Sequence, residues 1–138
     1  MFIVNYILGS HDVYVTPMYL FHSEKKAKNF VKRCEEVLNW INHNRESAAD
    51  REYDVQTGFF HTAIKIIEER KIPDSDIATR RAIYDELKAK DKQDWEAQVK
   101  KKMPRRLLTT YQLMAKFPEL QEPNNTEFSY EELEVIDE

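Results

Sequence analysis

Glycine is scarce in this chain: only two occur among its 138 residues, Gly9 and Gly58. Loops that cradle phosphate groups need several glycines, because only then can the backbone approach the ligand closely. The sequence therefore contains neither a P-loop nor a dinucleotide-binding fingerprint, and we expect no cofactor.

Metal ligands and catalytic motifs are equally sparse. Cys34 is the only cysteine, and no two of the four histidines lie three or four positions apart. Metal sites need several ligands at short spacings, so the sequence predicts no metal site. The motifs of common hydrolases and metalloproteases are absent. We therefore expect a protein that is not an enzyme. The alternative is a small enzyme centred on His61, with Glu68 as the carboxylate that orients it.

Long apolar runs are also missing. No run approaches the ~18 residues of a membrane span, and the first residues lack the basic flank of a signal peptide. A single cysteine cannot form a disulfide within the chain, which fits a reducing compartment. Cys34 lies among apolar residues at helical spacing, so we expect a buried, unreactive thiol. These absences predict a cytoplasmic protein with no membrane partner.

The clearest pattern present is a β-hairpin at the start of the chain. Residues 2–8 are apolar or aromatic except for Asn5, and residues 13–21 resume the pattern after a turn of Gly, Ser, His and Asp. β-Branched and aromatic residues of this kind favour strands. Pro17 lacks the N–H that a sheet ladder needs, so the second strand is expected to be an edge or to carry a bulge.

Four helices are expected after the hairpin. The first begins at the N-cap Ser23 and covers the hairpin with apolar residues spaced three and four apart, which are Ala27, Phe30, Val31, Cys34, Val37, Leu38 and Ile41. The second spans residues 48–71, and its alternative is a strand at 53–56 followed by a helix from Gly58. The third runs from 74 to 103 and is expected to bend or restart near residues 91–94, because Asp91 interrupts its apolar face. The fourth covers 104–117.

These elements predict an α+β fold with one compact domain over residues 1–118 and an acidic tail over 119–138. The tail has eight acidic residues and no basic one, although the whole chain has a net charge of only −4. It adds either a strand or a short helix. Its mixture of acidic and apolar residues is typical of a segment that binds a partner, for which the candidates are Phe128, Tyr130, Leu133 and Val135.

The first strand is apolar on both faces and needs a neighbour on its second edge. One possibility is pairing with residues 128–136 of the same chain, which gives a monomer. The other is pairing with the first strand of a second copy, which gives a symmetric homodimer. We favour pairing within the chain, because the tail's acids would keep the new sheet edge soluble.

A basic segment precedes the tail. Residues 88–106 contain eight basic and three acidic residues, with the densest cluster at Lys100, Lys101, Lys102, Arg105 and Arg106. Such a cluster neutralises phosphates and makes binding salt-dependent. The alternatives are a solvated helix face and a docking site for the acidic tail.

These observations lead to three hypotheses about function. The first is a non-enzymatic protein that binds another protein as an accessory factor, regulator or inhibitor; its small size and lack of motifs suit a viral or mobile-element origin. The second is a nucleic-acid-binding protein that uses residues 88–106, with the acidic tail as a gate. The third is the enzyme around His61.

Overall fold

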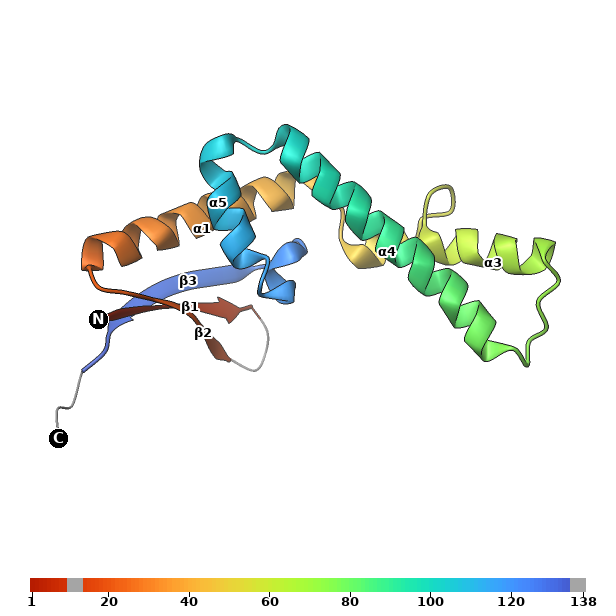
Figure 1. The fold of residues 1–138 in the computed structure, drawn as a ribbon, viewed down its shortest axis with the longest axis horizontal. Helices are drawn as coiled ribbons and strands as arrows, with labels where there is room; N and C mark the ends of the chain where they lie inside the picture. Colours follow the sequence, from red (N-terminus) through yellow and green to blue (C-terminus); the bar gives the residue numbers. More distant parts are fainter. Residues whose placement is uncertain (10–13, 135–138) are drawn as a thin grey trace. The chain divides into compact units, whose positions relative to one another are not determined.

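The computed structural model describes residues 1–9 and 14–134 of the chain. Contacts divide the chain into two compact units (Figure 1). Unit 1 comprises Met1–Arg45 and Pro104–Glu138, and unit 2 comprises Glu46–Met103, so unit 2 is inserted into the sequence of unit 1. The expected α+β fold with an N-terminal hairpin is confirmed. The expected compact domain over residues 1–118, with a tail over 119–138 that adds a strand or a short helix to it, stays a prediction.

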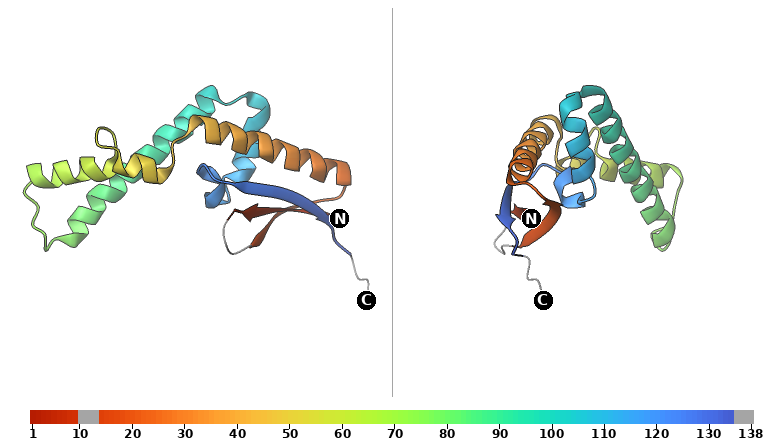
Figure 2. Two further views of the ribbon diagram at one scale, coloured as in Figure 1. Left: turned by 180° about the vertical axis from the view of Figure 1, so that it is seen from behind. Right: turned by 60° about the vertical axis from the view of Figure 1, so that its left-hand side comes forward.

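Unit 1 is a three-stranded antiparallel sheet with helices on one face (Figures 1 and 2). The strands lie in the order β2-β1-β3. Its elements are β1 (Phe2–Leu8), β2 (Val15–Phe21), α1 (Glu24–Asn44), α5 (Arg105–Met114), the 3-10 helix η1 (Pro118–Gln121) and β3 (Thr126–Glu132). The tail thus supplies the third strand, which confirms the pairing within the chain that we favoured.

Alternation along β1 divides its side chains between the two faces of the sheet. Val4 and Tyr6 point toward the helices and are almost completely buried. The Tyr6 ring packs edge-on against Phe117 at a centroid distance of 5.6 Å, and Tyr19 of β2 packs in the same way on Phe30 of α1 at 5.7 Å. The core of unit 1 therefore lies between this face of the sheet and α1.

Pro17 lies on an edge strand, and the pairing of β1 with β2 shifts register between Val4 and Asn5. Pro17 pairs with Asn5. In an antiparallel sheet the backbone N–H and C=O groups of successive residues point alternately to the two neighbouring strands, and those of Asn5 point toward β3. The nitrogen of Pro17 consequently points to the free edge, where no ladder hydrogen bond is lost. Both expected features, the edge and the bulge, are present.

Helix α1 begins as the sequence predicts. The Ser23 side chain accepts a hydrogen bond of 3.3 Å from the backbone N–H of Lys26. The buried residues of α1 are Ala27, Phe30, Cys34, Val37, Leu38 and Ile41, which is the expected stripe without Val31. Burial raises the pKa of the Cys34 thiol to about 12, so this thiol stays protonated and unreactive.

Unit 2 is built from α2 (Ala48–Tyr53), α3 (Phe59–Glu69) and α4 (Ile77–Lys102). The prediction of one helix over residues 48–71 is wrong, because a turn separates α2 from α3. The Asp54 carboxylate accepts hydrogen bonds from the backbone N–H groups of Gln56 and Thr57, at 2.9 and 2.7 Å. A Cβ on Gly58 would lie 2.4 Å from the backbone oxygen of Asp54, so this turn requires glycine.

Helix α4 is continuous, and the bend expected near Asp91 is absent. Asp91 lies on the inner side of the helix and forms an ion pair with Arg51 of α2. The Tyr84 hydroxyl donates a hydrogen bond to Glu52 of α2, and its ring packs on Phe59 at a centroid distance of 5.4 Å. Polar groups on the apolar face of α4 are therefore explained by partners on α2.

Candidate protein-binding surface

The sheet of unit 1 has one face that the helices of that unit do not cover (Figure 2). Ile3, Asn5 and Ile7 of β1 point to this face, because side chains alternate along a strand and Val4 and Tyr6 point to the other one. The residues of β2 and β3 that pair with these three point to the same face. We define the open face as these three residues of β1, with Val15, Pro17 and Leu20 of β2 and Glu127, Ser129 and Glu131 of β3.

The open face has an apolar half and an acidic half. Val15 and Leu20, on β2, are each 54% exposed, and they flank the partly buried isoleucines of β1. The side chains of Glu127 and Glu131, on β3, are exposed. The three strands contain acidic residues on β3 and no basic residue. The open face is thus an apolar surface beside a line of negative charge.

Asn5 joins the two halves. It lies at the centre of the open face and is only 5% exposed, although it is polar. Its side-chain amide donates a long hydrogen bond of 3.4 Å to the Glu131 carboxylate. This contact fixes the carboxylate over the sheet and keeps its charge beside the apolar half.

The partner-binding residues expected from the sequence are distributed between the two faces. Phe128 is 8% exposed and lies on the covered face. Tyr130 lies on that face too, with its ring 6.4 Å from Phe2 and its hydroxyl donating to Glu24 at 3.3 Å. Leu133 follows β3 and is 38% exposed, whereas Val135 lies outside the described residues. The two aromatic residues therefore stabilise unit 1, and their neighbours Glu127 and Glu131 form the surface.

The alternation in the tail was visible in the sequence, but it could not assign a face. Phe128 and Tyr130 share one parity of β3, and Glu127 and Glu131 share the other. Either parity could have pointed toward the helices. The contacts of β3 with α1 decide the matter. The sequence alone left the face open, because Leu133 and Val135 have the opposite parity to Phe128 and Tyr130.

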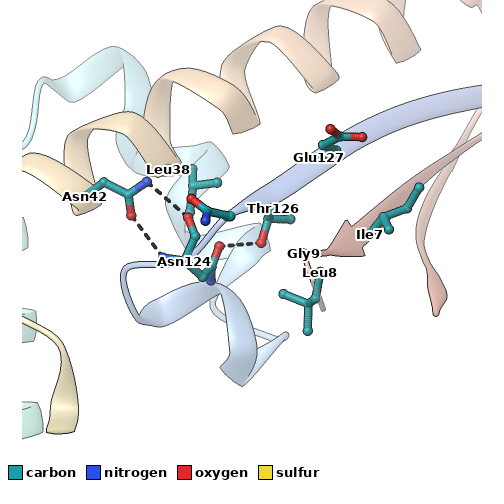
Figure 3. A pocket seen from close by; sticks show the side chains of 9 residues that line it. Ile7, Leu8, Gly9, Leu38, Asn42, Asn124, Thr126 and Glu127 are labelled. Atoms are coloured by element: carbon teal, nitrogen blue, oxygen red, sulfur yellow. Dashed lines mark hydrogen bonds between the residues drawn. The ribbon is translucent and has the colours of Figure 1, made fainter. Parts of the chain in front are cut away.

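A hollow of about 430 Å³ lies at one end of the sheet of unit 1 (Figure 3). Asn42 and Asn124 line it and bind each other. The Asn42 amide donates to the backbone oxygen of Asn124 at 3.2 Å, and its oxygen accepts from the backbone N–H of Asn124 at 3.1 Å. The other residues that line it are Ile7, Leu8, Gly9, Leu38, Asn125, Thr126 and Glu127.

The polar groups of this hollow hold the beginning of β3. The Asn124 amide donates to the backbone oxygens of Glu119 and Glu122, at 2.7 and 2.9 Å, and its oxygen accepts from the Thr126 hydroxyl. The Gly9 N–H donates to the oxygen of Asn125 at 2.7 Å. Since these groups are already bonded within unit 1, we assign the hollow a structural role.

The predicted basic segment is divided between the units. Lys100, Lys101 and Lys102 are exposed in the last turn of α4 in unit 2, where cations interact favourably with the negative end of the helix. Arg105 and Arg106 are exposed in the first turn of α5 in unit 1. Arg106 forms an ion pair with Glu36 of α1. The acids of Thr126–Glu132, which the gate hypothesis needs, belong to the sheet of unit 1.

His61 lies partly buried on α3, and its ring contacts that of Phe60 at a centroid distance of 5.8 Å. Glu68 is exposed on the same helix. Among the described residues, no group of three or more His, Cys, Asp or Glu side chains could hold a metal ion. The enzyme hypothesis stays an untested prediction.

No protein-family model, curated protein or solved structure matches this chain. Within residues 1–9 and 14–134, no helix has both the length and the apolar character needed to cross a lipid bilayer. Function is therefore inferred from the surfaces of the two units.

Proposed function

We propose that this protein acts by binding another protein, as an accessory factor, regulator or inhibitor, and that the open face is the binding surface. The observation that carries this proposal is an apolar sheet face, beside a line of carboxylates, that the helices of unit 1 leave uncovered. Exposed apolar patches rimmed by polar residues are typical of interaction sites.

The charge of the open face limits the chemistry of the partner. Glu127 and Glu131 favour a partner surface with lysine or arginine beside apolar side chains. The same carboxylates repel the phosphates of nucleic acids. A second copy bound through this face would bring further acids and no bases against them. The partner is therefore a different protein with a basic and apolar surface.

The size of the open face limits the affinity. Three strands of seven residues cover about 14 by 23 Å, or about 300 Å², given the spacing of strands and residues in a sheet. Stable interfaces bury about 800 Å² on each partner. We therefore expect a transient complex, unless the partner also contacts surfaces beyond the open face.

The cell compartment and oligomeric state follow as parts of the same proposal. Cys34 is a free thiol, which fits the reducing conditions of the cytoplasm. Because β3 occupies the second edge of β1, the protein needs no second copy to complete its sheet, and we expect a monomer.

The proposal is tested by capture from a lysate with matched variants. Val15→Lys combined with Leu20→Lys places two cations on the open face. Val55→Lys combined with Ile77→Lys makes the same change at residues of unit 2 that are 80% and 67% exposed. We expect a defined protein to be captured by the wild type and the unit 2 variant and lost with the open-face variant. Equal capture by both variants would contradict the proposal.

The purified partner then gives a quantitative test. Glu127→Lys combined with Glu131→Lys should weaken binding, and the loss should shrink as salt concentration rises, because salt screens exposed charges. Isothermal titration at two salt concentrations measures both effects. Binding that is unchanged by this pair of substitutions would remove the acidic half from the proposed surface.

A further inference from the structure

The charges of unit 1 are segregated between its parts. Its helical stretches, residues 24–45 and 104–118, contain nine basic and three acidic residues. The segment from residue 119 onward contains eight acids and no base. Two of these acids, Glu127 and Glu131, lie on the open face, on the side of the sheet away from the helices (Figure 2). Glu119 instead accepts a hydrogen bond from Tyr6, and Glu122 forms an ion pair with Arg45.

The positive charge is concentrated in the first half of α1. All five basic residues there are exposed, and they are Lys25, Lys26, Lys28, Lys32 and Arg33. Lys25, Lys28 and Lys32 follow one another at spacings of three and four, on the side of the helix away from its buried stripe. We call these three residues the α1 lysine row.

Helix stability does not explain the α1 lysine row. Lys25 lies in the first turn, where a cation interacts unfavourably with the positive end of the helix. Lys28 and Lys32, four residues apart, repel each other, although Glu24 and Glu36 each lie four residues from one of them and offset this repulsion. Lys100, Lys101 and Lys102 are different, because they lie at the end of α4 where cations stabilise the helix. The predicted basic cluster thus lies at the helix end that favours cations, whereas the α1 lysine row lies nearer the end that disfavours them.

We propose that the α1 lysine row binds the phosphate backbone of a nucleic acid, with Lys26 and Arg33 beside it. From Lys25 to Lys32 the helix rises about 10 Å, and phosphates follow one another along one strand at about 3.4 Å of duplex axis. The row therefore reaches about three phosphates. The acidic sheet is repelled by the same backbone, so the open face stays turned outward. This inference is independent of the proposed protein partner.

Two matched triple variants test this inference. Lys25→Glu, Lys28→Glu and Lys32→Glu reverse the α1 lysine row, and Lys100→Glu, Lys101→Glu and Lys102→Glu reverse the cluster on α4. Fluorescence anisotropy is measured with a short DNA duplex and an RNA duplex of the same sequence, over a series of salt concentrations. Circular dichroism checks that both triple variants keep their helices, so that a loss of binding can be separated from a loss of folding.

We expect the wild type to bind at least one duplex at about 50 mM salt. The α1 variant should lose about tenfold or more in affinity, and its plot of log affinity against log salt should become less steep by about 2–3. The α4 variant should stay within about twofold of the wild type. The duplex that binds more tightly identifies the source of the phosphates.

Three results would overturn the inference. The first is a wild type that binds neither duplex at low salt. The second is an equal loss in both triple variants, which would mean a general attraction to polyanions. The third is a larger loss in the α4 variant, which would return the binding site to the segment that the sequence alone suggested.

Discussion

The contacts within unit 1 and those within unit 2 join residues at very different separations along the sequence. In unit 1, Asn5 bonds Glu131, 126 positions away, and Tyr130 bonds Glu24, 106 positions away. In unit 2, Tyr84 bonds Glu52, only 32 positions away. Unit 1 therefore requires both ends of the described chain, whereas unit 2 forms from one continuous stretch. Changes near either end of the chain should therefore destabilise unit 1 and leave unit 2 folded.

The units also differ in how completely they bury their apolar side chains. Of the 19 buried apolar residues in the described chain, 13 belong to unit 1 and six to unit 2. In unit 2, Tyr53 and Phe60 pack on each other at a centroid distance of 5.5 Å but remain 60% and 37% exposed. We infer that unit 1 has the more complete core and unit 2 depends more on its polar contacts.

The largest expected effect comes from removal of β3. Truncation after Asn125 exposes the second edge of β1, which is apolar and unprotected, so we expect aggregation. Unit 2 should keep its helices, because its contacts are local. Light scattering measures aggregation, and hydrogen exchange reports on each unit. A truncated protein that is soluble and equally stable would contradict the importance of this pairing.

The next effect separates buried from exposed positions on one helix. Phe30→Ala should lower the free energy of unfolding of unit 1 by about 3–5 kcal/mol, because the ring is buried against Tyr19 and Phe21. Lys28→Ala, at an exposed position, should change it by less than about 0.5 kcal/mol. Chemical denaturation of both variants checks this. Equal losses would mean that α1 packs through a different face.

Two glycine substitutions compare the units directly. In Gly58→Ala the new Cβ lies 2.4 Å from the oxygen of Asp54 in unit 2, and in Gly9→Ala it lies 2.8 Å from the oxygen of Asn125 in unit 1. Each should cost about 1–3 kcal/mol, with the larger loss at Gly58. Hydrogen exchange should report each loss only in the unit that carries the substitution. A loss spread over both units would show that they unfold together.

The smallest effect concerns pH. Hydrogen bonds from Thr57 and Gln56 hold the pKa of the Asp54 carboxyl below its ordinary value. The charged form is favoured in the folded state, so the turn is stabilised above the unfolded pKa and loses that stabilisation as pH falls through the folded pKa. Nuclear magnetic resonance of the Thr57 amide should show a midpoint below that of an unfolded aspartate.

Asp54→Asn serves as the control for this titration, since asparagine keeps the acceptor oxygen but has no carboxyl. Its Thr57 amide should show no transition in the same pH range. If the wild-type midpoint lay at or above the ordinary value, the hydrogen bonds of the turn would not be present in solution as described.

The parts of the fold that could be predicted depend on local patterns. The hairpin, the cap at Ser23 and the stripe of α1 follow from turn chemistry and periodicity, which act over a few residues. Apolar periodicity predicts one helix over residues 48–71, because this periodicity continues through the break. The sequence signal for the break is Asp54 followed four positions later by Gly58. The turn that these two residues form outweighs the apolar periodicity.

The parts that could not be predicted depend on distant contacts. The sequence predicts an interruption at Asp91, because a local pattern cannot reveal its partner Arg51 on another helix. The division into two units and the choice of face for β3 are of the same kind. The proposed open face follows from that choice, whereas the sequence predicts Phe128 and Tyr130, which the structure places on the covered face.

The position of β3 in the sheet also determines the order in which the protein can be completed during synthesis. Phe2–Leu8 emerges early, whereas Thr126–Glu132 follows the whole of unit 2. At a synthesis rate of about 5–20 residues per second, β1 waits about 6–24 s for its second neighbour. Unit 2 can fold during that interval, but one edge of β1 stays unpaired. The nascent chain is therefore exposed to misassociation until the tail has been made.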